Sequence, residues 1–524
     1  MPLRSLLERG YFPKEIPSPP FTTAPFAKVV TAPTVTLPDD FRQGESPTHK
    51  IPTAKVGRYS HARGGLLRRE LGICNPLHYY LLSKVIVDHW SIISPHVLFS
   101  RLAATAPAFK TTGRAIDGLH SQSHRTLLAQ KNRIGGKYLL QTDISRFYNS
   151  IYTHSIPWAI HTKSVAKKRR GRALVGNNID YIVRMGQDGQ TIGIPIGPDT
   201  SLVIAELILQ RCDKELISIT PNIKGHRFID DYELSFPTRS EAETAFHQLE
   251  MLLRDFELAL NPKKTRVIEL PDPLEPAWVT ELRNQPIRSS INGQARDIET
   301  LMNKAFGLHK KHPDEPVLSY AIARLRTIPL HPDNWLHFQR CLLLCVIPEP
   351  ATFPYAIELI IKWVNAGFPA PIPELEEVVN TIILTHAPLS HSSEISHALW
   401  ACLALRLNIN EPSAKALSQA NDSVSALMAL DCESKGLITT GLSKAQWERH
   451  MTAESLYDEH WLLAYEANIK GWLPTVGGGD HVAADPNFGF LKASDVYFYD
   501  ITSIATAPIP SPTLPTLNTL RLSP

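Results

Sequence analysis

The chain has 524 residues, of which 43% are hydrophobic and 20% charged, values that are ordinary for a globular protein with a sizeable core. Its net charge is only +3, so overall charge does not argue for a nucleic-acid partner, and the local distribution of charge has to be read instead. The six cysteines are scattered without a C-x-x-C pair, which argues against a zinc ribbon or a disulfide framework and fits a reducing cytoplasm.

The first fifty residues are proline-rich and irregular, as in GYFPKEIPSPPFTTAPF, and predict an extended arm laid over the body of the protein. We expect no signal peptide, because MPLRSLLERGYF lacks a long apolar stretch. No apolar run reaches the roughly 18 residues that a membrane span needs. We therefore expect a cytoplasmic protein with no membrane contact.

The next part of the chain alternates strand and helix patterns. A helix is predicted to start at Asn75-Pro76, and KYLLQTD, residues 137–143, predicts a strand that ends in an acid, with Ser145 as candidate N-cap of the helix that follows. A long apolar helix follows from about Thr200, then the hairpin GHRFIDDYELSF. An S-x-x-E capping box at Ser240 opens a further helix. This order predicts an α+β layer, with a small antiparallel sheet covered by helices on one face.

Beyond about residue 290 the pattern becomes purely helical. Segments of 12 to 18 residues with helical spacing are separated by prolines, and their regular succession suggests stacked helical hairpins of the solenoid type. The predicted helices span residues 298–311, 316–328, 334–346, 354–366, 372–386 and 392–406. Residues 476–524 are rich in Gly, Pro and Thr and are expected to wrap the surface, with the strand-like DVYFYDI as an exception.

Asp143 and the pair Asp230-Asp231 are the strongest candidates for chemistry. Asp143 ends a predicted strand and the pair sits in the turn of the predicted hairpin, so we expect the three carboxylates side by side at one end of the sheet. Carboxylates held so close repel one another and need compensation. Two Mg²⁺ ions about 4 Å apart would supply it, one activating a 3′-hydroxyl and the other binding triphosphate oxygens. The alternative is that Asp231 is a solvated turn residue and Asp143 a helix cap.

Five motifs in one order over about residues 55–270 resemble the reverse transcriptases. QTDISRFYNSI resembles their motif A, GIPIGPDTS their motif B and FIDDY their motif C, while LNPKKT is similar to the lysine-bearing motif that follows and RRELGICNP to the fingers motif. The resemblance implies a right-hand polymerase with fingers and palm. Cys74 replaces a proline of the fingers motif and Phe228 a frequent tyrosine of motif C. Ile196 replaces a common glutamine, which puts ordinary templated copying in doubt more than catalysis.

Within that family, three segments resemble the bacterial abortive-infection and defence-associated reverse transcriptases: GYFPKEIPSPPFTT, IPIGPDTSLVIAE and DEHWLLAYEANIKGWL. In these proteins an all-α helical-repeat domain replaces the thumb. The resemblance implies an N-terminal arm over residues 1–54, fingers and palm over 55–285, the helical-repeat domain over 286–475 and a tail over 476–524. It also implies a homo-oligomer, as a ring or another higher assembly.

The resemblance also assigns roles to individual residues. Asp143 and Asp230 become ligands of two Mg²⁺ ions with Asp231 in support, and Lys264 assists the leaving pyrophosphate, with Lys263 as the alternative. Tyr148, five positions after Asp143, becomes the ring that excludes a ribose 2′-OH, unless it is a core aromatic. The remaining contacts to the dNTP are assigned to Arg68, Arg69, Gly193, Pro195 and Gly197; for the arginines the alternative is a solvated surface.

Two further features lie outside the motifs. A dense basic run lies between motifs A and B and is predicted to bind nucleic-acid phosphates, although such a run is often only a solvated face. Its members are Lys163, Lys167, Lys168, Arg169, Arg170 and Arg172. Because some members of the subfamily start DNA from a protein hydroxyl, Tyr59 in GRYSHARGG is a candidate priming residue, with packing or nucleic-acid contact as the alternative.

The hypothesis for function is a Mg²⁺-dependent DNA polymerase of the reverse-transcriptase type that acts in antiphage defence. It would use dNTPs and either copy a bound non-coding RNA or synthesise DNA without a template, with RNA and the DNA product as partners. The alternative is a non-catalytic RNA-binding scaffold that keeps the polymerase fold. The retention of all three aspartates favours the enzyme.

Overall fold

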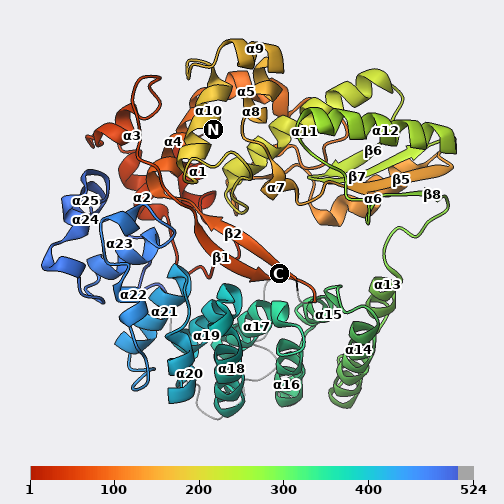
Figure 1. Ribbon diagram of the computed structural model, residues 1–524. Helices are drawn as coiled ribbons and strands as arrows, with labels where there is room; N and C mark the ends of the chain where they lie inside the picture. The colour runs from red at the N-terminus through yellow and green to blue at the C-terminus, as the bar shows by residue number, and fades with distance from the viewer. Residues whose placement is uncertain (1, 66, 505–524) are drawn as a thin grey trace.

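The computed structural model describes residues 2–65 and 67–504. Figure 1 shows a mixed α/β part, built from the N-terminal half of the chain, above a row of helices from the C-terminal half. All eight strands of the described residues fall between Gly57 and Glu269. In the described part of the chain, no helix combines the length and the apolarity needed to cross a membrane.

The N-terminal segment is more ordered than the sequence predicts. It forms three short helices, α1 (Leu3–Arg9), α2 (Ala24–Val30) and α3 (Asp39–Gln43). Tyr11 is fully buried and its ring stacks on that of Tyr79 with 4.2 Å between centroids. The expectation of an irregular, extended arm is therefore wrong in part. The prolines keep the helices short, but buried aromatic side chains anchor the segment to the body.

A two-stranded hairpin and a group of helices follow the N-terminal segment. Strands β1 (Gly57–Ala62) and β2 (Arg68–Ile73) pair antiparallel, with Gly57 opposite Ile73 and Ala62 opposite Arg68. The predicted helix start at Asn75 is confirmed, because its side chain accepts a hydrogen bond from Leu77 N at 3.1 Å. The other elements of this part are α4 (Pro76–Asp88), α5 (Trp90–Val97), β3 (Pro107–Phe109), β4 (Ile116–Gly118), α8 (Ser155–His161), α9 (Lys163–Lys168) and α10 (Val175–Met185).

The main sheet has four antiparallel strands in the order β6-β7-β5-β8. Along β7, Tyr232, Leu234 and Phe236 are buried beneath α11 and α12, and the alternate residues face the opposite side, where α6 covers the β6 edge. The elements are α6 (Arg125–Arg133), β5 (Tyr138–Asp143), α7 (Phe147–Ser150), α11 (Asp199–Ile219), β6 (Lys224–Phe228), β7 (Asp231–Phe236), α12 (Arg239–Asp255) and β8 (Arg266–Glu269).

Two predicted helix caps are wrong. Ser145 does not cap α7, which starts after Arg146 in a left-handed conformation, and the Ser145 amide instead donates to Ala259 O at 2.9 Å. The capping box of α12 is made by Thr238 and Glu241, two residues before the predicted pair. The predicted pair and the pair Thr238–Glu241 both have the spacing of a capping box. The helix begins at the pair that lies nearer the end of β7.

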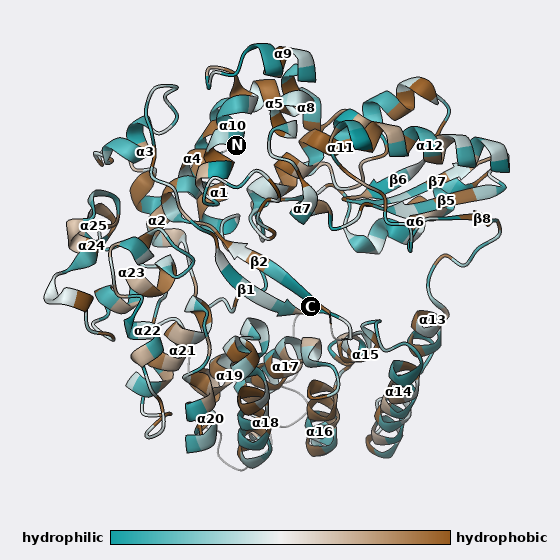
Figure 2. Cartoon of the chain, in the orientation of Figure 1, coloured by the Kyte–Doolittle hydropathy of each residue, from teal (hydrophilic) through white to brown (hydrophobic). Residues whose placement is uncertain are grey.

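The second half of the described chain is helical. Helices α14 to α19 match the predicted segments to within a few residues, except that α14 starts earlier. The bounds are α13 (Ala277–Arg283), α14 (Ile291–Lys311), α15 (Val317–Leu325), α16 (Trp335–Val346), α17 (Phe353–Asn365), α18 (Ile372–His386), α19 (Ser392–Leu405), α20 (Glu411–Leu417), α21 (Ser423–Ser434), α22 (Ala445–Glu448), α23 (Trp461–Ile469), α24 (His481–Ala484) and α25 (Pro486–Ala493). Figure 2 shows apolar and polar residues sharing each of α14, α16 and α18, as expected for stacked amphipathic helices.

The helical half folds back onto the β1–β2 hairpin. Helices α19 and α21 contact β1, and the buried indole of Trp461 donates to Ile73 O at 3.1 Å. The segment DEHWLLAYEANIKGWL therefore closes the chain onto the end of β2. Further along the chain, DVYFYDI was predicted to be a strand, and this prediction is wrong. Within this segment only Tyr499 forms a β-bridge, and its partner is Phe21 of the N-terminal segment. The part of the predicted tail from 505 to 524 lies outside the described residues.

Candidate active site

Three carboxylates lie at one end of the four-stranded sheet. Asp143 is the last residue of β5 and pairs in register with Asp231, the first residue of β7. Asp230 lies in the turn that precedes β7, and its carbonyl accepts from Ile144 N at 3.2 Å. The structure thus brings the three predicted acids together. It corrects one detail, because the turn consists of Ile229 and Asp230, while Asp231 already belongs to the strand.

The turn places a β-branched residue in a left-handed conformation. Ile229 has φ = +53°, a region that side chains of its shape rarely occupy and that a tight hairpin usually gives to glycine. Two hydrogen bonds hold the residue there. Thr105 Oγ1 accepts from Ile229 N at 2.8 Å, and Arg227 Nη1 donates to Ile229 O at 2.8 Å. The strain is therefore balanced by groups outside the turn.

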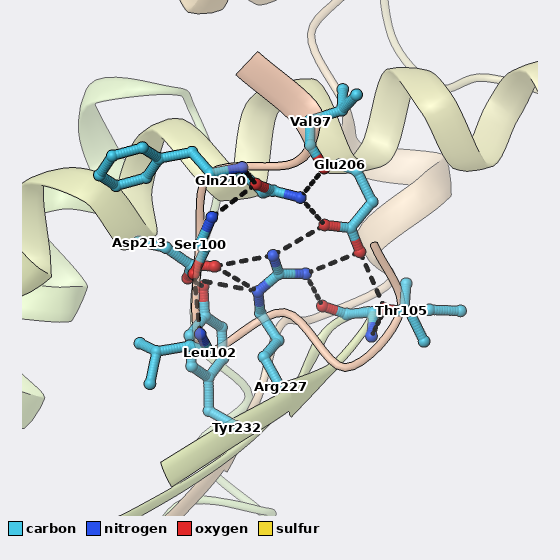
Figure 3. A network of polar contacts seen from close by, with 11 residues as sticks. Val97, Ser100, Leu102, Thr105, Glu206, Gln210, Asp213, Arg227 and Tyr232 are labelled. Atoms are coloured by element: carbon cyan, nitrogen blue, oxygen red, sulfur yellow. Dashed lines mark hydrogen bonds and ion pairs between the residues drawn. The ribbon is translucent and has the colours of Figure 1, made fainter. Parts of the chain in front are cut away.

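Arg227 belongs to a fully buried ion network beneath this turn (Figure 3). Its Nη2 lies 2.9 Å from Glu206 Oε2 and 2.8 Å from Asp213 Oδ2, both on α11. Burial opposes the charge of Arg227, but the two carboxylates outweigh it and raise its pKa. Tyr232 donates to Asp213 at 2.9 Å and Thr105 to Glu206 at 2.8 Å. The network ties the hairpin turn to α11.

The carboxylate of Asp143 is held by the LNPKKT segment. Lys264 Nζ lies 2.8 Å from its Oδ2, and Asn261 Nδ2 donates to its Oδ1 at 3.1 Å. Partial burial disfavours the charge on Lys264, but the hydrogen bond to Asp143 and the nearby acids raise its pKa. Lys264 is thus the lysine that reaches the acids, whereas only the backbone amide of Lys263 bonds in this loop, to Asn261 Oδ1.

The donor set fits a divalent cation. Burial, followed by repulsion from Asp143, raises the pKa of Asp230 to about 6, so the ionised carboxylate is poorly compensated by the protein alone. Asp231 differs, because Arg125 Nη1 lies 3.2 Å from its Oδ2. A metal ion would compensate Asp143 and Asp230 together, and Mg²⁺ prefers such a pair of carboxylates to a complete protein cage.

Tyr148 and the motif B loop pack against each other beside the acids. The carbonyl of Tyr148 accepts from Ile194 N at 2.9 Å, and Gly193 N donates to Ile151 O at 2.8 Å. Gly193 has φ = +85°, and Gly197 has φ = +121° with its Cα so close to Pro13 that a Cβ would lie 2.6 Å from that ring. These glycines let the loop pass between α7 and the N-terminal segment.

Pro195 lies against the β1–β2 hairpin. A Cβ at Gly72 of β2 would come within 2.7 Å of the Pro195 ring, and Gly72 N donates to Ile196 O at 2.8 Å. Ile196 makes this hydrogen bond through its backbone carbonyl. The bond therefore does not depend on whether the side chain at this position is isoleucine or the glutamine that is common in the family. The predicted members of motif B thus connect the hairpin to the acid-bearing end of the sheet.

The arginines of the hairpin divide into two groups. Arg68 was expected to contact a triphosphate, but its guanidinium forms two hydrogen bonds with Glu394, at 2.6 and 2.8 Å, and this expectation is wrong. Arg69 is exposed. Burial raises the pKa of Tyr148, and the nearby positive charge of Arg69 partly opposes this increase. Arg63 lies near the acids: partial burial and the charge of Arg69 lower its pKa, while Asp230 and Asp143 oppose the change.

The basic run is split by the fold. Lys163 donates to Asp255 O at 3.2 Å and lies over the Trp158 ring, and Arg172 lies over the Tyr181 ring and donates to backbone carbonyls of the N-terminal segment. Arg172 therefore has a structural role, which corrects its assignment to nucleic acid. The other four are exposed: Lys167, Lys168, Arg169 and Arg170. Figure 1 shows α9 on the side of the molecule opposite to the helical half.

Tyr59 is not placed to prime synthesis. Its side chain is 0% exposed, and its hydroxyl lies 2.9 Å from Ser396 Oγ and donates to Glu15 O at 3.1 Å. The tyrosine therefore joins β1 to α19 and to the N-terminal segment, as its packing alternative implies. A hydroxyl with both contacts satisfied and no exposed surface cannot reach a nucleotide.

Two clefts lie near the acid-bearing end of the sheet, although none of the three acids lines either of them. One, of about 1010 Å³, lies at the tip of the hairpin between Arg63, Lys264 and the helical residues Tyr355 and Trp400. The other, of about 620 Å³, lies at the base of the hairpin. It is lined in part by Arg58, Arg146, Asn149 and the motif B residues Gly193 and Pro195. Lys264, which bonds to Asp143, lines the cleft at the hairpin tip and connects it to the acids.

Several residues of the site were not singled out from the sequence. Asn261 was part of a quoted motif, and its spacing before Lys264 was the available signal. Arg63, Arg125 and Arg227 had no such signal. Arg125 reaches the acids across a long sequence separation, in its ion pair with Asp231, and Arg227, although it lies in the hairpin itself, is fixed by acids of α11.

We expect Asp230→Asn to stabilise the metal-free protein at pH 8. The raised pKa means that the folded state disfavours the ionised carboxylate, so this cost is absent below the unfolded pKa near 4 and complete above about 6. In EDTA the variant should gain about 1–3 kcal/mol at pH 8, and the gain should shrink to nothing near pH 4. Thermal unfolding of both proteins across this pH range measures it.

The control for this experiment is Asp231→Asn, which removes the partner of Arg125 and should not stabilise. A stability difference for Asp230→Asn that does not change between pH 4 and pH 8 would contradict the argument.

Comparison with known proteins gives one family match. A search of curated proteins finds no match. Among solved structures 56 chains match, including a telomerase from Candida albicans in complex with the TWJ fragment of telomeric RNA, with 10% sequence identity, 64% of this chain and 62% of that chain covered, and a TM-score of 0.30. That score is too low for any argument.

Residues 69–301 match the family model for reverse transcriptase (RNA-dependent DNA polymerase). These residues therefore form a domain of the reverse transcriptase type, and its family description indicates RNA-directed DNA polymerase (nucleotidyltransferase) activity.

Proposed function

We propose that this protein is a Mg²⁺-dependent DNA polymerase that makes DNA from dNTPs. The observation that carries the proposal is the register of Asp143 opposite Asp231, with Asp230 in the adjoining turn and Lys264 Nζ 2.8 Å from Asp143 Oδ2. Three acids and one lysine converge at the end of a sheet, and the lysine also lines the cleft at the hairpin tip. This is the arrangement that nucleotidyl transfer requires.

The acids have unequal roles. Asp143 and Asp230 hold the metal ions, because Asp230 is the carboxylate whose charge the protein leaves uncompensated, while Asp231 keeps its bond to Arg125. Bound there, Mg²⁺ would activate the attacking 3′-hydroxyl and neutralise the triphosphate. The Lys264 ammonium, which stays charged because its pKa is raised, would protonate the leaving pyrophosphate.

The nucleotide would lie between the β1–β2 hairpin and the motif B loop. Arg69 is exposed toward Tyr148, and Arg63 lies near Asp143 and Asp230, so both guanidinium groups can contact a triphosphate. Tyr148 is partly exposed beside the loop and would exclude a ribose 2′-OH. Gly193, Pro195 and Gly197 would bring the backbone close to the nascent base pair.

Nucleic acid would pass through the cleft at the hairpin tip. That cleft is bounded on one side by Lys264 and Arg63 and on the other by helical residues such as Tyr355 and Trp400. The helices of residues 286–475 would thus replace a thumb, with fingers and palm over 55–285. The exposed part of the basic run, Lys167 to Arg170, lies away from this cleft and would bind phosphates of an outer stretch of RNA or DNA.

Antiphage defence is the proposed setting, with the protein acting in the cytoplasm as a homo-oligomer. Support comes from the three segments that resemble the defence-associated reverse transcriptases, one of which contains Trp461, the residue that closes the helical half onto β2. The template would be a bound non-coding RNA or none at all. The stacked helices α14 to α19 offer an extended surface for assembly.

The purified protein is expected to incorporate labelled dNTPs into DNA when Mg²⁺ is present. Asp143→Asn and Asp230→Asn should each lower incorporation by at least about a thousandfold, since each removes a ligand shared by the metal ions. Asp231→Asn should lower it less. Gel analysis of labelled product measures the activity, and sequencing of the product and of any co-purified RNA identifies the template.

The matched control is Asp333→Asn, which changes an exposed acid of the helical half that lines neither cleft. If the Asp143 and Asp230 variants synthesise as much DNA as the wild type, the polymerase proposal fails. If no protein makes DNA but all bind RNA equally, the non-catalytic scaffold is the better account.

A second prediction concerns sugar selectivity. Tyr148→Ala should raise the incorporation of rNTPs relative to dNTPs by about tenfold or more, because the ring that meets the 2′-OH is removed. The ratio of kcat/KM values for the two nucleotides measures it. Phe147→Leu, a change at the buried neighbouring ring, should leave the ratio unaltered. Equal ratios for wild type and Tyr148→Ala would show that Tyr148 is only a packing residue.

A further inference from the structure

A cluster of metal-binding side chains lies in the helical half, away from the three aspartates. His386 ends α18, His391 lies just before α19, and Glu394 lies in the first turn of α19. The two imidazole Nδ1 atoms are 2.9 Å apart, and Glu394 Oε1 is 3.7 Å from the first and 3.8 Å from the second. The three side chains thus bring one ligand atom each within 4.8 Å of one another.

The separations fit one transition-metal ion. A circle through the three atoms with these separations has a radius of about 2.0 Å, so a point exists that is about 2.0 Å from each of them. Zinc binds imidazole nitrogen and carboxylate oxygen at about 2.0–2.2 Å. We propose that His386, His391 and Glu394 bind a divalent transition-metal ion such as Zn²⁺, independently of the polymerase site.

The surroundings of Glu394 are those of a metal ligand. Its side chain is 2% exposed, and Arg68 donates to both of its oxygens at 2.6 and 2.8 Å. Ser393 Oγ donates to Oε2 at 2.6 Å. Carboxylates that bind a metal are commonly fixed by such outer hydrogen bonds, and each oxygen has two lone pairs. Oε1, which accepts only from Arg68, therefore keeps a lone pair for an ion.

The guanidinium also limits the strength of the site. Arg68 and the ion would share a single carboxylate, and neutral imidazoles add no negative charge, so the ion would sit beside an uncompensated positive charge. Three protein ligands leave at least one position open to water, because His386 and His391 are partly exposed. The binding should be weaker than that of a four-ligand structural zinc site.

Without an ion, the two imidazoles and Glu394 cannot all be satisfied by hydrogen bonds through these atoms. At 2.9 Å one Nδ1 has to donate its proton to the lone pair of the other, and then no Nδ1 proton remains for Glu394 Oε1. An ion satisfies all three atoms at once. It would also fix the α18–α19 turn against the hairpin, since Ser392 and Ser393 accept from Ser60 N and Ala62 N of β1 at 3.1 and 3.0 Å.

The test is a calorimetric Zn²⁺ titration of the full-length protein after removal of metals with a chelator. Excess Mg²⁺ occupies the aspartate site throughout. We expect one Zn²⁺ per chain, and at least a tenfold loss of affinity in both His386→Ala and His391→Ala. The control is His124→Ala, which changes an exposed histidine whose ring centroid lies 5.4 Å from that of His120 and should leave binding intact.

A second readout does not depend on the variants folding. The wild-type protein loaded with Co²⁺ should show the visible absorption of a four- or five-coordinate ion, and Zn²⁺ should remove it. A wild type that binds no Zn²⁺ under excess Mg²⁺, a Co²⁺ spectrum of a six-coordinate aqueous ion, or equal Zn²⁺ affinity in wild type and His391→Ala would each overturn the proposal.

Discussion

The buried ion network around Arg227 is the interaction on which the turn that carries Asp230 depends. Its guanidinium joins Glu206 and Asp213 of α11 and donates to the carbonyl of Ile229, which occupies a left-handed conformation unusual for its side chain. The network holds two carboxylates against one guanidinium, so it carries one net negative charge in the core. Removing Arg227 would leave both acids unpaired, at a cost of about 3–5 kcal/mol.

Neutral donors share the compensation of that charge. Thr105, Gln210 and Tyr232 each donate to one of the two carboxylates. Thr105 also accepts from Ile229 N, so the same hydroxyl satisfies the network and holds the turn. The backbone of Arg227 adds a further link, because its amide donates to Leu102 O and its carbonyl accepts from Ala104 N. The turn that carries Asp230 is thereby fixed from two sides.

A rigid turn matters because the acids above it repel one another. The position of Asp143 is set by β5 and by the LNPKKT segment, and that of Asp230 by the strained turn. Both carboxylates are therefore held close together, and burial, followed by this repulsion, raises the pKa of Asp230. Holding two carboxylates together in this way costs stability in the metal-free protein, as charged and strained arrangements at functional sites commonly do.

The hairpin connects this site to the helical half. Pro195 packs on Gly72 at its base, and Arg68 bonds to Glu394 at its other end. The proposed transition-metal site shares Glu394 with that ion pair. Occupancy there would act on the position of the hairpin, and therefore on Arg69 and Arg63, without touching the aspartates.

Local patterns predicted much of the fold. Apolar spacing and the prolines between segments located α14 to α19, and the strand that ends at Asp143 was recognised with its partner hairpin. Both depend on residues close together in the chain. The order of motifs then identified the acids and Lys264, because their types and spacing are dictated by the chemistry.

Long-range contacts were not predictable in this way. Arg68 and Glu394 are separated by 326 positions, and nothing near Arg68 distinguishes it from the exposed Arg69. Tyr59 is buried by the N-terminal segment and α19, and Arg172 is used to hold backbone carbonyls of that segment. In each case the residue type fits both a functional role and a structural role. Only the tertiary contacts show that the residue has the structural role.

The most direct measurement is an anomalous diffraction map from crystals grown with Mn²⁺ and a dNTP. The account predicts Mn²⁺ bound by both Asp143 and Asp230, with Lys264 displaced from Asp143 toward the phosphates and the Ile229 turn unchanged. A map without Mn²⁺ at either carboxylate, in which Lys264 still bonds to Asp143 beside a bound nucleotide, would contradict it.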